Sequence, residues 1–378
     1  MLLDKQIQIL VFKIDDKGTF DNIGEIDEFD SLIWPSKFDG FSEFELWAPI
    51  NDENAELLKK GNVIWCRGQK ASIVEIVKSS MDNRGTKTLH VKGRTLESLF
   101  DRRIVWDTYV GKGNVSTIMY DLVNKNCVNP TNPDRKIPFL TLSEDEKIGD
   151  KINFQRTGGT VYEALQDLAS SEDIGFEVIF EPRLRKLVFK VLSGVDRTIE
   201  QKDEDPIEFS TDLEDIIKSA YYSNEQNFKN VALVAGEDSG TQRKKQIVGD
   251  KNSKGFFRRE LYVDARDLQT TVTDDKGETV IIPDDEYSQM LDQRGRLKLS
   301  DFKKIETFES QIRVFGDVQY EFGVDFFEGD KVTVRDRELG VIVSARITEV
   351  EEGFGKDYSL ILTFGYSMPT LIDRIKQM

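Results

Sequence analysis

Hydrophobic and polar residues alternate along the first hundred residues, which is the pattern of half-buried β-strands. In Phe41–Ala48, for example, Phe44, Leu46 and Ala48 fall on one face of a strand. Leu96, Leu99 and Phe100 instead have helical spacing and predict a short helix that plugs one end. We expect about seven antiparallel strands in 1–104, enough to close a small barrel or sandwich. The strands are expected at 6–14, 23–26, 31–34 (with Pro35 as an edge or a break), 41–48, 61–66, 71–80 and 86–92, with a helical turn at 54–60.

The pattern becomes helical after Trp106. Val115, Ile118, Met119 and Leu122 share one helix face, and Thr160–Glu163 reads T-V-Y-E, a capping box in front of a second apolar stripe. Strands at 175–180 and 186–192 form a predicted hairpin, and prolines 130, 133 and 138 predict a loop. Residues 105–205 are therefore predicted to be an α+β domain that ends in a solvated linker, Gln201–Pro206.

Strands resume at Ile207 and continue to Phe364, interrupted by a helical segment at 284–306 in which Gly295 is a possible break. The expected strands are 216–223, 229–236, 244–249, 255–263 and 309–315, followed by more up to 364. The predicted fold is mainly β with α+β. Its domains are a first β-barrel (1–104), an α+β domain (105–205) and a second, similar β-barrel (206–375) with a small helical insert at about 265–308.

Two parts of the sequence repeat the same order of features. A glycine and short strand (Gly61–Cys66), a strand pair and the segment GRTLESLFDRRI from Gly93 recur as GDKVTV from Gly329, a strand pair and GYSMPTLIDRI from Gly365. The offset grows from 268 (Gly61 to Gly329) to 272 (Asp101 to Asp373), as longer hairpin loops would cause. We interpret this as an internal duplication; a chance match of two β-rich segments is the alternative.

Composition limits the function classes. The chain has 378 residues, 38% hydrophobic, with 24 Phe and a net charge of −17. Several packed cores are therefore possible, whereas such an acidic chain is a poor DNA binder, because DNA is bound through cations. No apolar run is long enough to span a membrane, and no signal peptide opens the chain. Cys66 and Cys127 are expected to be buried free thiols, as suits a reducing cytoplasm.

No group of residues predicts an active, cofactor or metal site. His90 is the only histidine and is expected to be an ordinary strand residue, so a nucleophilic pair with Cys66 or Cys127 is not expected. Gly111–Gly113 lacks the third glycine of a dinucleotide loop, and 69 acidic residues do not single out a glycosidase pair. The remaining candidates are expected to be structural: Asp274-Asp275 and Asp284-Asp285-Glu286 as turns or helix starts rather than calcium sites, and Lys254–Arg259 as a partner-facing strand or core hairpin rather than a nucleic-acid contact.

Five segments carry a resemblance to a known family: 34–49 (WPSKFDGFSEFELWAP), 91–105 (VKGRTLESLFDRRIV), 123–138 (VNKNCVNPTNPDRKIP), 230–237 (NVALVAGE) and 258–268 (RRELYVDARDL). They resemble the phage tail-hub (baseplate hub) family, in particular the siphophage tail-tip hub and the N-terminal hub region of tail-associated lysins.

The resemblance implies a non-enzymatic homotrimer in which two barrels per chain make a pseudo-sixfold ring. Such a ring would join the sixfold tail tube to threefold distal components, and DNA would pass through its channel without specific binding. The implied partners are a distal tail protein, a tape-measure protein and receptor-binding or lysin proteins. The implied location is the virion tail tip, and the host bacterial cytoplasm during assembly. Many members continue into a lysin or receptor-binding region, whereas this sequence ends at Met378. The alternatives are a cell-wall hydrolase and a carbohydrate-binding adhesion module.

Overall fold

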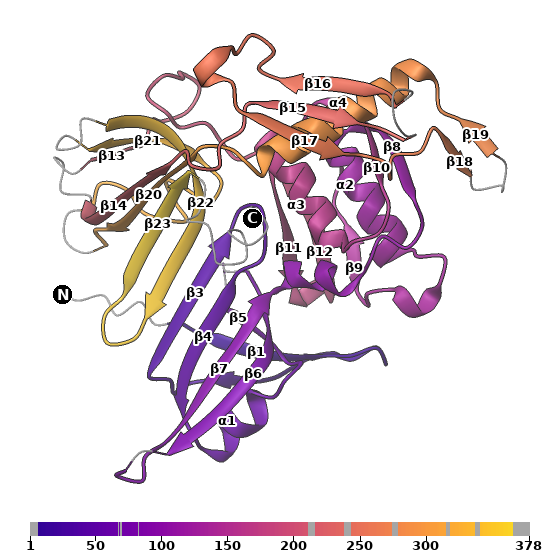
Figure 1. Cartoon of the computed structure of the whole chain (residues 1–378). Helices are drawn as coiled ribbons and strands as arrows, with labels where there is room; N and C mark the ends of the chain where they lie inside the picture. The colour runs from indigo at the N-terminus through magenta and orange to yellow at the C-terminus, as the bar shows by residue number, and fades with distance from the viewer. Residues whose placement is uncertain are drawn as a thin grey trace.

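The protein is mainly β, with helices beside the main sheet and a further helix in an insert (Figure 1). A computed structural model describes residues 7–66, 68, 70–81, 83–210, 216–237, 243–273, 279–314, 318–336 and 341–365. Its largest element is a 13-stranded sheet with the order β14-β20-β23-β22-β3-β4-β7-β6-β5-β1-β2; β21 also pairs with β22, and β13 with β21. The strands are β1 (Ile9–Ile14), β2 (Phe20–Ile26), β3 (Ser31–Lys37), β4 (Glu43–Pro49), β5 (Val63–Cys66), β6 (Ser72–Met81), β7 (Lys87–Thr95), β13 (Glu208–Ser210), β14 (Ile216–Asn224), β20 (Ile305–Ile312), β21 (Lys331–Asp336), β22 (Val341–Phe354) and β23 (Ser359–Gly365).

The first half of this sheet, β1 to β7, curls around a core of its own. The inward residues of β4, Phe44, Leu46 and Ala48, pack with Ile9 of β1 and Ile64 of β5. This is the alternation predicted from the sequence. The short helices are α1 (Asp52–Leu57), which Asn51 caps, and the 3₁₀ helix η1 (Leu96–Arg102).

The α+β module packs on the other side of the first body and shares a core with it. Phe176 and Phe189 of its sheet each contact Phe100 of η1 edge to face, and they contact each other in a tilted pair. Helix α3 starts with the predicted capping box: the Thr160 hydroxyl accepts from the Glu163 amide, and the Glu163 carboxylate accepts from the Thr160 amide. The elements are β8 (Tyr109–Asn114), α2 (Val115–Val123), the π-helical η2 (Asn124–Val128), the 3₁₀ helices η3 (Pro133–Arg135) and η4 (Pro182–Leu184), β9 (Leu140–Leu142), β10 (Lys151–Arg156), α3 (Val161–Glu172), β11 (Gly175–Glu181) and β12 (Lys186–Leu192).

The second half of the large sheet encloses a separate core rich in phenylalanine. Phe209 contacts Phe326 and Phe364, and Phe364 also contacts Phe308. Figure 1 shows the yellow strands β22 and β23 of this second body beside the indigo β3 of the first body.

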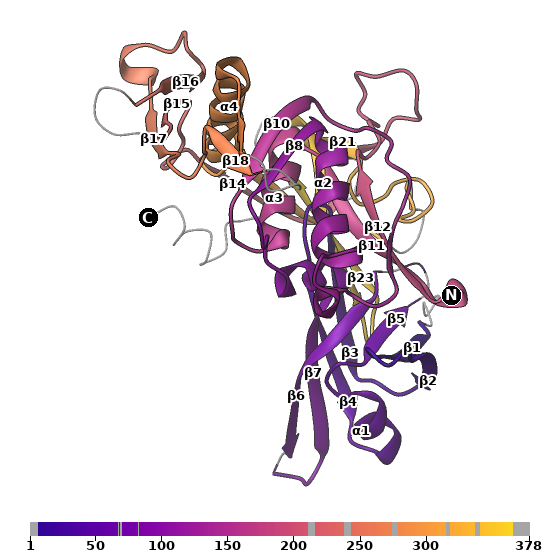
Figure 2. The same cartoon turned by 90° about the vertical axis from the view of Figure 1, so that its right-hand side faces the viewer.

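Between β14 and β20 the chain leaves the second body and forms an insert, seen at the upper left of Figure 2. Its sheet β16-β15-β17 packs on α4, and Gly295 lies where these two meet: a Cβ there would come within 2.8 Å of Val234 and Val248. The elements are β15 (Val231–Ala235), β16 (Lys245–Gly249), the 3₁₀ helix η6 (Gly255–Phe257), β17 (Glu260–Asp264), β18 (Thr271–Thr273), β19 (Thr279–Ile281) and α4 (Asp284–Ser300).

Some local predictions were wrong. Pro35 does not break the strand but lies inside β3. It lies where β4 no longer pairs with β3, so this side of β3 is an edge there, as the other interpretation of Pro35 allowed, and the missing N–H removes no bond from that ladder. Gly295 does not break α4, because it is needed for close packing rather than for a turn. Residues 255–263 form a 3₁₀ turn before a shorter strand.

Other predictions stay open. Among the described residues the large sheet is curled, but no strand pairing joins β2 to β3. Closure of the barrels therefore remains a prediction. The domain limits also remain predictions, and the repeated tail beyond residue 365 lies outside the described residues. In the part of the chain that the structure describes, no helix has the length and apolar character to cross a membrane.

Candidate assembly interface

The two halves of the large sheet contain the same path of five strands. In the first body the order is β3-β4-β7-β6-β5, and in the second it is β14-β20-β23-β22-β21. Every neighbouring pair along both paths is antiparallel. We call these two paths the first and second repeats. They differ beyond this path, because β1 joins β5 antiparallel whereas β13 joins β21 parallel.

The two repeats agree in detail at the predicted glycine pair. Gly61 and Gly329 both have φ of 90°, which favours glycine. The Gly61 amide donates to Val74 O and the Gly329 amide to Ile347 O, both at 2.8 Å. The next step of the ladder also matches, because Val74 N donates to Asn62 O and Ile347 N to Asp330 O.

A bulge follows these bonds at the same place in both repeats. The register shifts between Val74 and Ile76 in the first and between Ile347 and Glu349 in the second. Val74 faces Gly93 and Ile347 faces Phe364, so the sequence alignment of Gly93 with Gly365 was off by one residue. Equivalent core positions are buried in both: Ile64 and Val332, Val74 and Ile347, Phe44 and Phe308, Ala48 and Ile312, Val91 and Leu362, and Leu89 and Leu360.

The two repeats are joined edge to edge by β3 and the end of β22. Six antiparallel pairs make this junction, from Glu349 opposite Lys37 to Phe354 opposite Leu32. Trp34 of β3 is 1% exposed, stacks on Phe44 with ring centroids 5.6 Å apart, and donates its indole N–H to Lys70 O at 3.1 Å. Two separate cores are therefore connected by one continuous backbone ladder.

Acidic side chains gather near the junction on the sheet face that points away from both cores. They are Glu45, Glu309, Glu349 and Glu351, from β4, β20 and β22. Burial raises the pKa of Glu351, and the nearby charges of Glu349, Glu309 and Glu45 raise it further. Lys37 lies 3.6 Å from Glu349, and Glu45 bonds Lys92 and His90. This face is thus acidic but partly neutralised.

A buried arginine fixes the α+β module to the second body. Arg346 donates to both carboxylate oxygens of Asp173 at 2.9 Å, and to carbonyl oxygens of Asp173, Ser193 and Gly329. Burial alone would raise the pKa of Asp173, but the bonds from Arg346 and Lys331 hold this pKa below its usual value. Paired, fully bonded charges of this kind fix one relative orientation.

A second charged contact crosses from the first body to the second. Lys70 donates to Glu328 at 2.9 Å and to Lys37 O at 2.5 Å. Burial alone would lower the pKa of Lys70, but the negative charges of Glu328, Glu97 and Glu177 hold this pKa above its usual value. Lys70 therefore stays charged between the two bodies.

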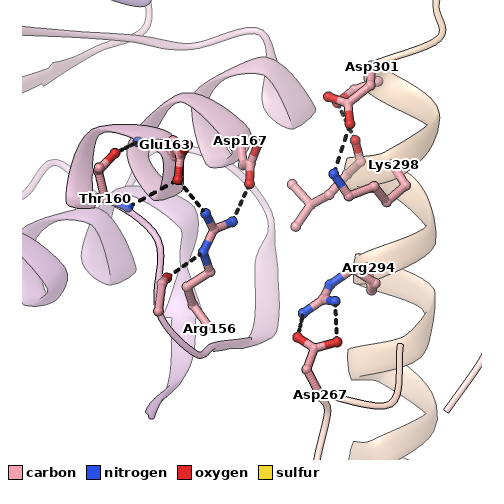
Figure 3. A network of polar contacts seen from close by, with 11 residues as sticks. Arg156, Thr160, Glu163, Asp167, Asp267, Arg294, Lys298 and Asp301 are labelled. Atoms are coloured by element: carbon pink, nitrogen blue, oxygen red, sulfur yellow. Dashed lines mark hydrogen bonds and ion pairs between the residues drawn. The ribbon is translucent and has the colours of Figure 1, made fainter. Parts of the chain in front are cut away.

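Figure 3 shows polar groups of the α+β module and of the insert that face each other, each bonded within its own part. Arg156 binds Asp167 at 2.6 Å and Glu163 at 3.3 Å on α3, while Arg294 of α4 makes a two-bond pair with Asp267. Across the contact, Asn153 donates to Gln289 at 2.6 Å. The insert therefore packs against the α+β module beside the large sheet.

The residues considered for chemistry are separated by the structure. Cys66 is buried in the first core, where burial raises its pKa, and His90 lies on the opposite face of the sheet, stacked on Trp47. Cys127 is also buried, and both thiols are free, as predicted. Gly111–Gly113 lies within strand β8 and not in a loop.

The charged clusters have structural partners. Asp284 binds Lys244 and Glu286 binds Lys112 in the first turn of α4, as the helix-start interpretation predicted. Asp274-Asp275 lies outside the described residues, and within those residues no three potential ligands gather at a metal-like site. Lys254–Arg259 is neither a strand nor a core hairpin, because Phe256 and Phe257 are 90% and 77% exposed.

Solved structures share this fold at low identity. The tail protein of Neisseria meningitidis MC58 matches with a TM-score of 0.54 and 15% identity, over 96% of this chain and 97% of that one. The prophage tail protein gp18 of Listeria monocytogenes EGD-e gives 0.54 and 12%, over 98% of both chains. The 43 kDa tail protein of prophage MuSo2 from Shewanella oneidensis gives 0.55 and 13%, over 94% and 97%.

Sequence comparison identifies the family directly. No curated protein matches this sequence. Residues 11–366, however, match the family described as siphovirus ReqiPepy6 Gp37-like protein. The resemblance to phage tail proteins is thereby confirmed, and the chain belongs to the siphovirus ReqiPepy6 Gp37-like family of tail proteins.

Proposed function

We propose that this protein is a structural hub of a phage tail tip, in which three copies form a ring of six similar sheets. The observation that carries the proposal is the repeated five-strand path, joined within one chain through β3 and β22. A threefold particle built from such chains offers six similar positions to a sixfold tube and three to distal components. Closed rings form from heterologous contacts when the rotation between neighbours closes.

Charge supports passage of DNA through this ring. Three chains of net charge −17 carry −51, and DNA is not retained by a surface without a cationic excess. The acidic sheet face with Glu45, Glu309, Glu349 and Glu351 belongs to both repeats and is the face that we assign to the channel. The insert and the α+β module would then contact neighbouring proteins of the tail, including a distal tail protein, a tape-measure protein and receptor-binding or lysin proteins.

The experiment is a mass measurement on the purified full chain by light scattering, with negative-stain images of the same sample. A mass of three chains (43.3 kDa each) and a central opening are expected. A monomer at every concentration, both alone and mixed with tail-tip proteins, would refute the proposal.

A further inference from the structure

Each repeat has two different edge strands with which another repeat can pair. Within the chain, one edge strand of the first repeat pairs with the other kind of edge strand of the second repeat. The first repeat offers β3, which takes the end of β22 from the second repeat. The equivalent of β3 in the second repeat is β14, and the equivalent of the end of β22 is Ile76–Met81 of β6. Among the described residues, β14 pairs only with β20, and Ile76–Met81 pairs only with β7.

These two edges carry only part of the usual protection. Natural edge strands carry charges, prolines or bulges that prevent pairing with other chains. Each has one lysine, Lys218 or Lys78, and a bulge at its start, but neither segment contains a proline. Exposed apolar side chains lie beside the lysines: Ile217 and Tyr221 on β14, and Ile76 and Met81 on β6. Two unpaired edges with exposed apolar side chains, on opposite sides of one sheet, suit a strand-to-strand contact.

The register of such a contact follows from the junction already made inside the chain. Ile33 faces Gly353 there. Ile33 pairs with Glu45 as Ala220 pairs with Glu309, so Ala220 is the equivalent of Ile33. The first residue after the shared bulge is Ile76 in the first repeat and Glu349 in the second. Ser80 and Gly353 each lie four residues further along, so Ser80 is the equivalent of Gly353.

We propose that β14 of one copy pairs antiparallel with Ile76–Met81 of a second copy, with Ala220 opposite Ser80 and Tyr222 opposite Lys78. This inference rests on the proposed ring and names the contact that closes it. The contact is head to tail, because each copy gives β14 to one neighbour and receives β14 from the other. It repeats the geometry of β3 and β22, so every sheet in the ring meets the next in the same way.

Cysteine cross-linking tests the register directly. Opposite residues of an antiparallel pair have Cβ atoms ~5 Å apart, within reach of a disulfide after small adjustment. Ser80 and Ala220 are both exposed, and the natural Cys66 and Cys127 are buried and do not compete. The variant Ser80→Cys with Ala220→Cys, oxidised with copper phenanthroline, should shift on a non-reducing gel from one chain to a covalent trimer. Lys78→Cys with Tyr222→Cys is a second, independent pair on the same face.

The matched control is Ser80→Cys with Ser219→Cys, which moves one thiol by one residue to the other face of the strand. It should give little trimer. Circular dichroism and light scattering before oxidation establish that each variant folds and assembles. A ring of normal mass in which neither designed pair cross-links, or in which the control cross-links equally, overturns this contact and leaves the hub function standing. A chain that never forms a ring contradicts both.

Discussion

Trp34 and Tyr221 occupy equivalent positions in the two repeats but have unlike surroundings, which allows a matched pair of substitutions. Trp34 is 1% exposed and Tyr221 is 38% exposed. Trp34→Ala removes a fully buried ring, for which such changes cost about 3–5 kcal/mol. This sum includes the stack on Phe44, worth about 0.5–1.5 kcal/mol, and the bond to Lys70 O, worth about 1 kcal/mol. Tyr221→Ala, at an open edge, should change the stability of the isolated chain by at most about 0.5 kcal/mol.

The assay is urea unfolding followed by far-ultraviolet circular dichroism, at a concentration where light scattering finds the single chain. Trp34→Ala should lower the unfolding midpoint clearly more than Tyr221→Ala does. Trp34→Phe should fall between, because it keeps most of the ring packing and loses the indole N–H. Equal effects of Trp34→Ala and Tyr221→Ala would refute the reasoning, since they would mean that Trp34 is not buried in the first core in solution.

The remaining predictions concern charge, packing and the hydrolase alternative. Asp173→Asn should reduce stability in full at pH 7 and progressively less as pH falls below about 3.9. The reason is that a carboxyl with a depressed pKa stabilises the fold above its unfolded pKa of about 3.9 and loses this stabilisation as pH falls through its lower folded pKa. In urea titrations, an effect that does not shrink with falling pH would contradict the pairing with Arg346. Glu351→Gln should do the opposite and raise the midpoint at pH 7 but not at pH 3.5, because an acid with a raised pKa favours folding only while protonated. Gly295→Ala should destabilise the insert by about 1–3 kcal/mol through overpacking against Val234 and Val248. A Gly→Ala change in an exposed helix would instead stabilise it by about 1 kcal/mol. Limited proteolysis of the insert, faster if the change destabilises and slower if it stabilises, distinguishes the two. A zymogram on Gram-positive cell walls should show no lytic band, and a clear band would favour the hydrolase.

Local patterns predicted much of the fold. The alternation in Phe41–Ala48 placed a strand with the correct inward face, and the T-V-Y-E box placed the start of α3. The pairing of Gly61 with Gly329 was also correct, because both glycines meet the same demand, a positive φ at the start of the repeat.

The junction between the repeats could not be predicted in this way. β3 and β22 lie about three hundred residues apart, and Pro35, interpreted as an edge or a break, lies within the strand that makes the contact. The alignment of Gly93 with Gly365 failed because these glycines serve different needs. A Cβ would meet a backbone oxygen at both, Ile73 O at Gly93 and Glu306 O at Gly365, but only Gly365 also has a positive φ, of 82°.

The exposed phenylalanines of the insert show a further limit. An apolar pair within Lys254–Arg259 suggested a buried hairpin or a partner-facing strand, yet Phe256 and Phe257 end a 3₁₀ turn that projects from the sheet β16-β15-β17. The hydrophobic pattern of a sequence does not distinguish an aromatic residue buried in the core from one exposed in an interaction surface.

Averaged electron-microscope images of the purified chain, viewed along its axis, test the central claim most directly. The account predicts a closed particle of three chains with an open centre and six similar lobes around it. A particle without an opening, or one in which the two repeats of each chain lie at unlike distances from the axis, would contradict it.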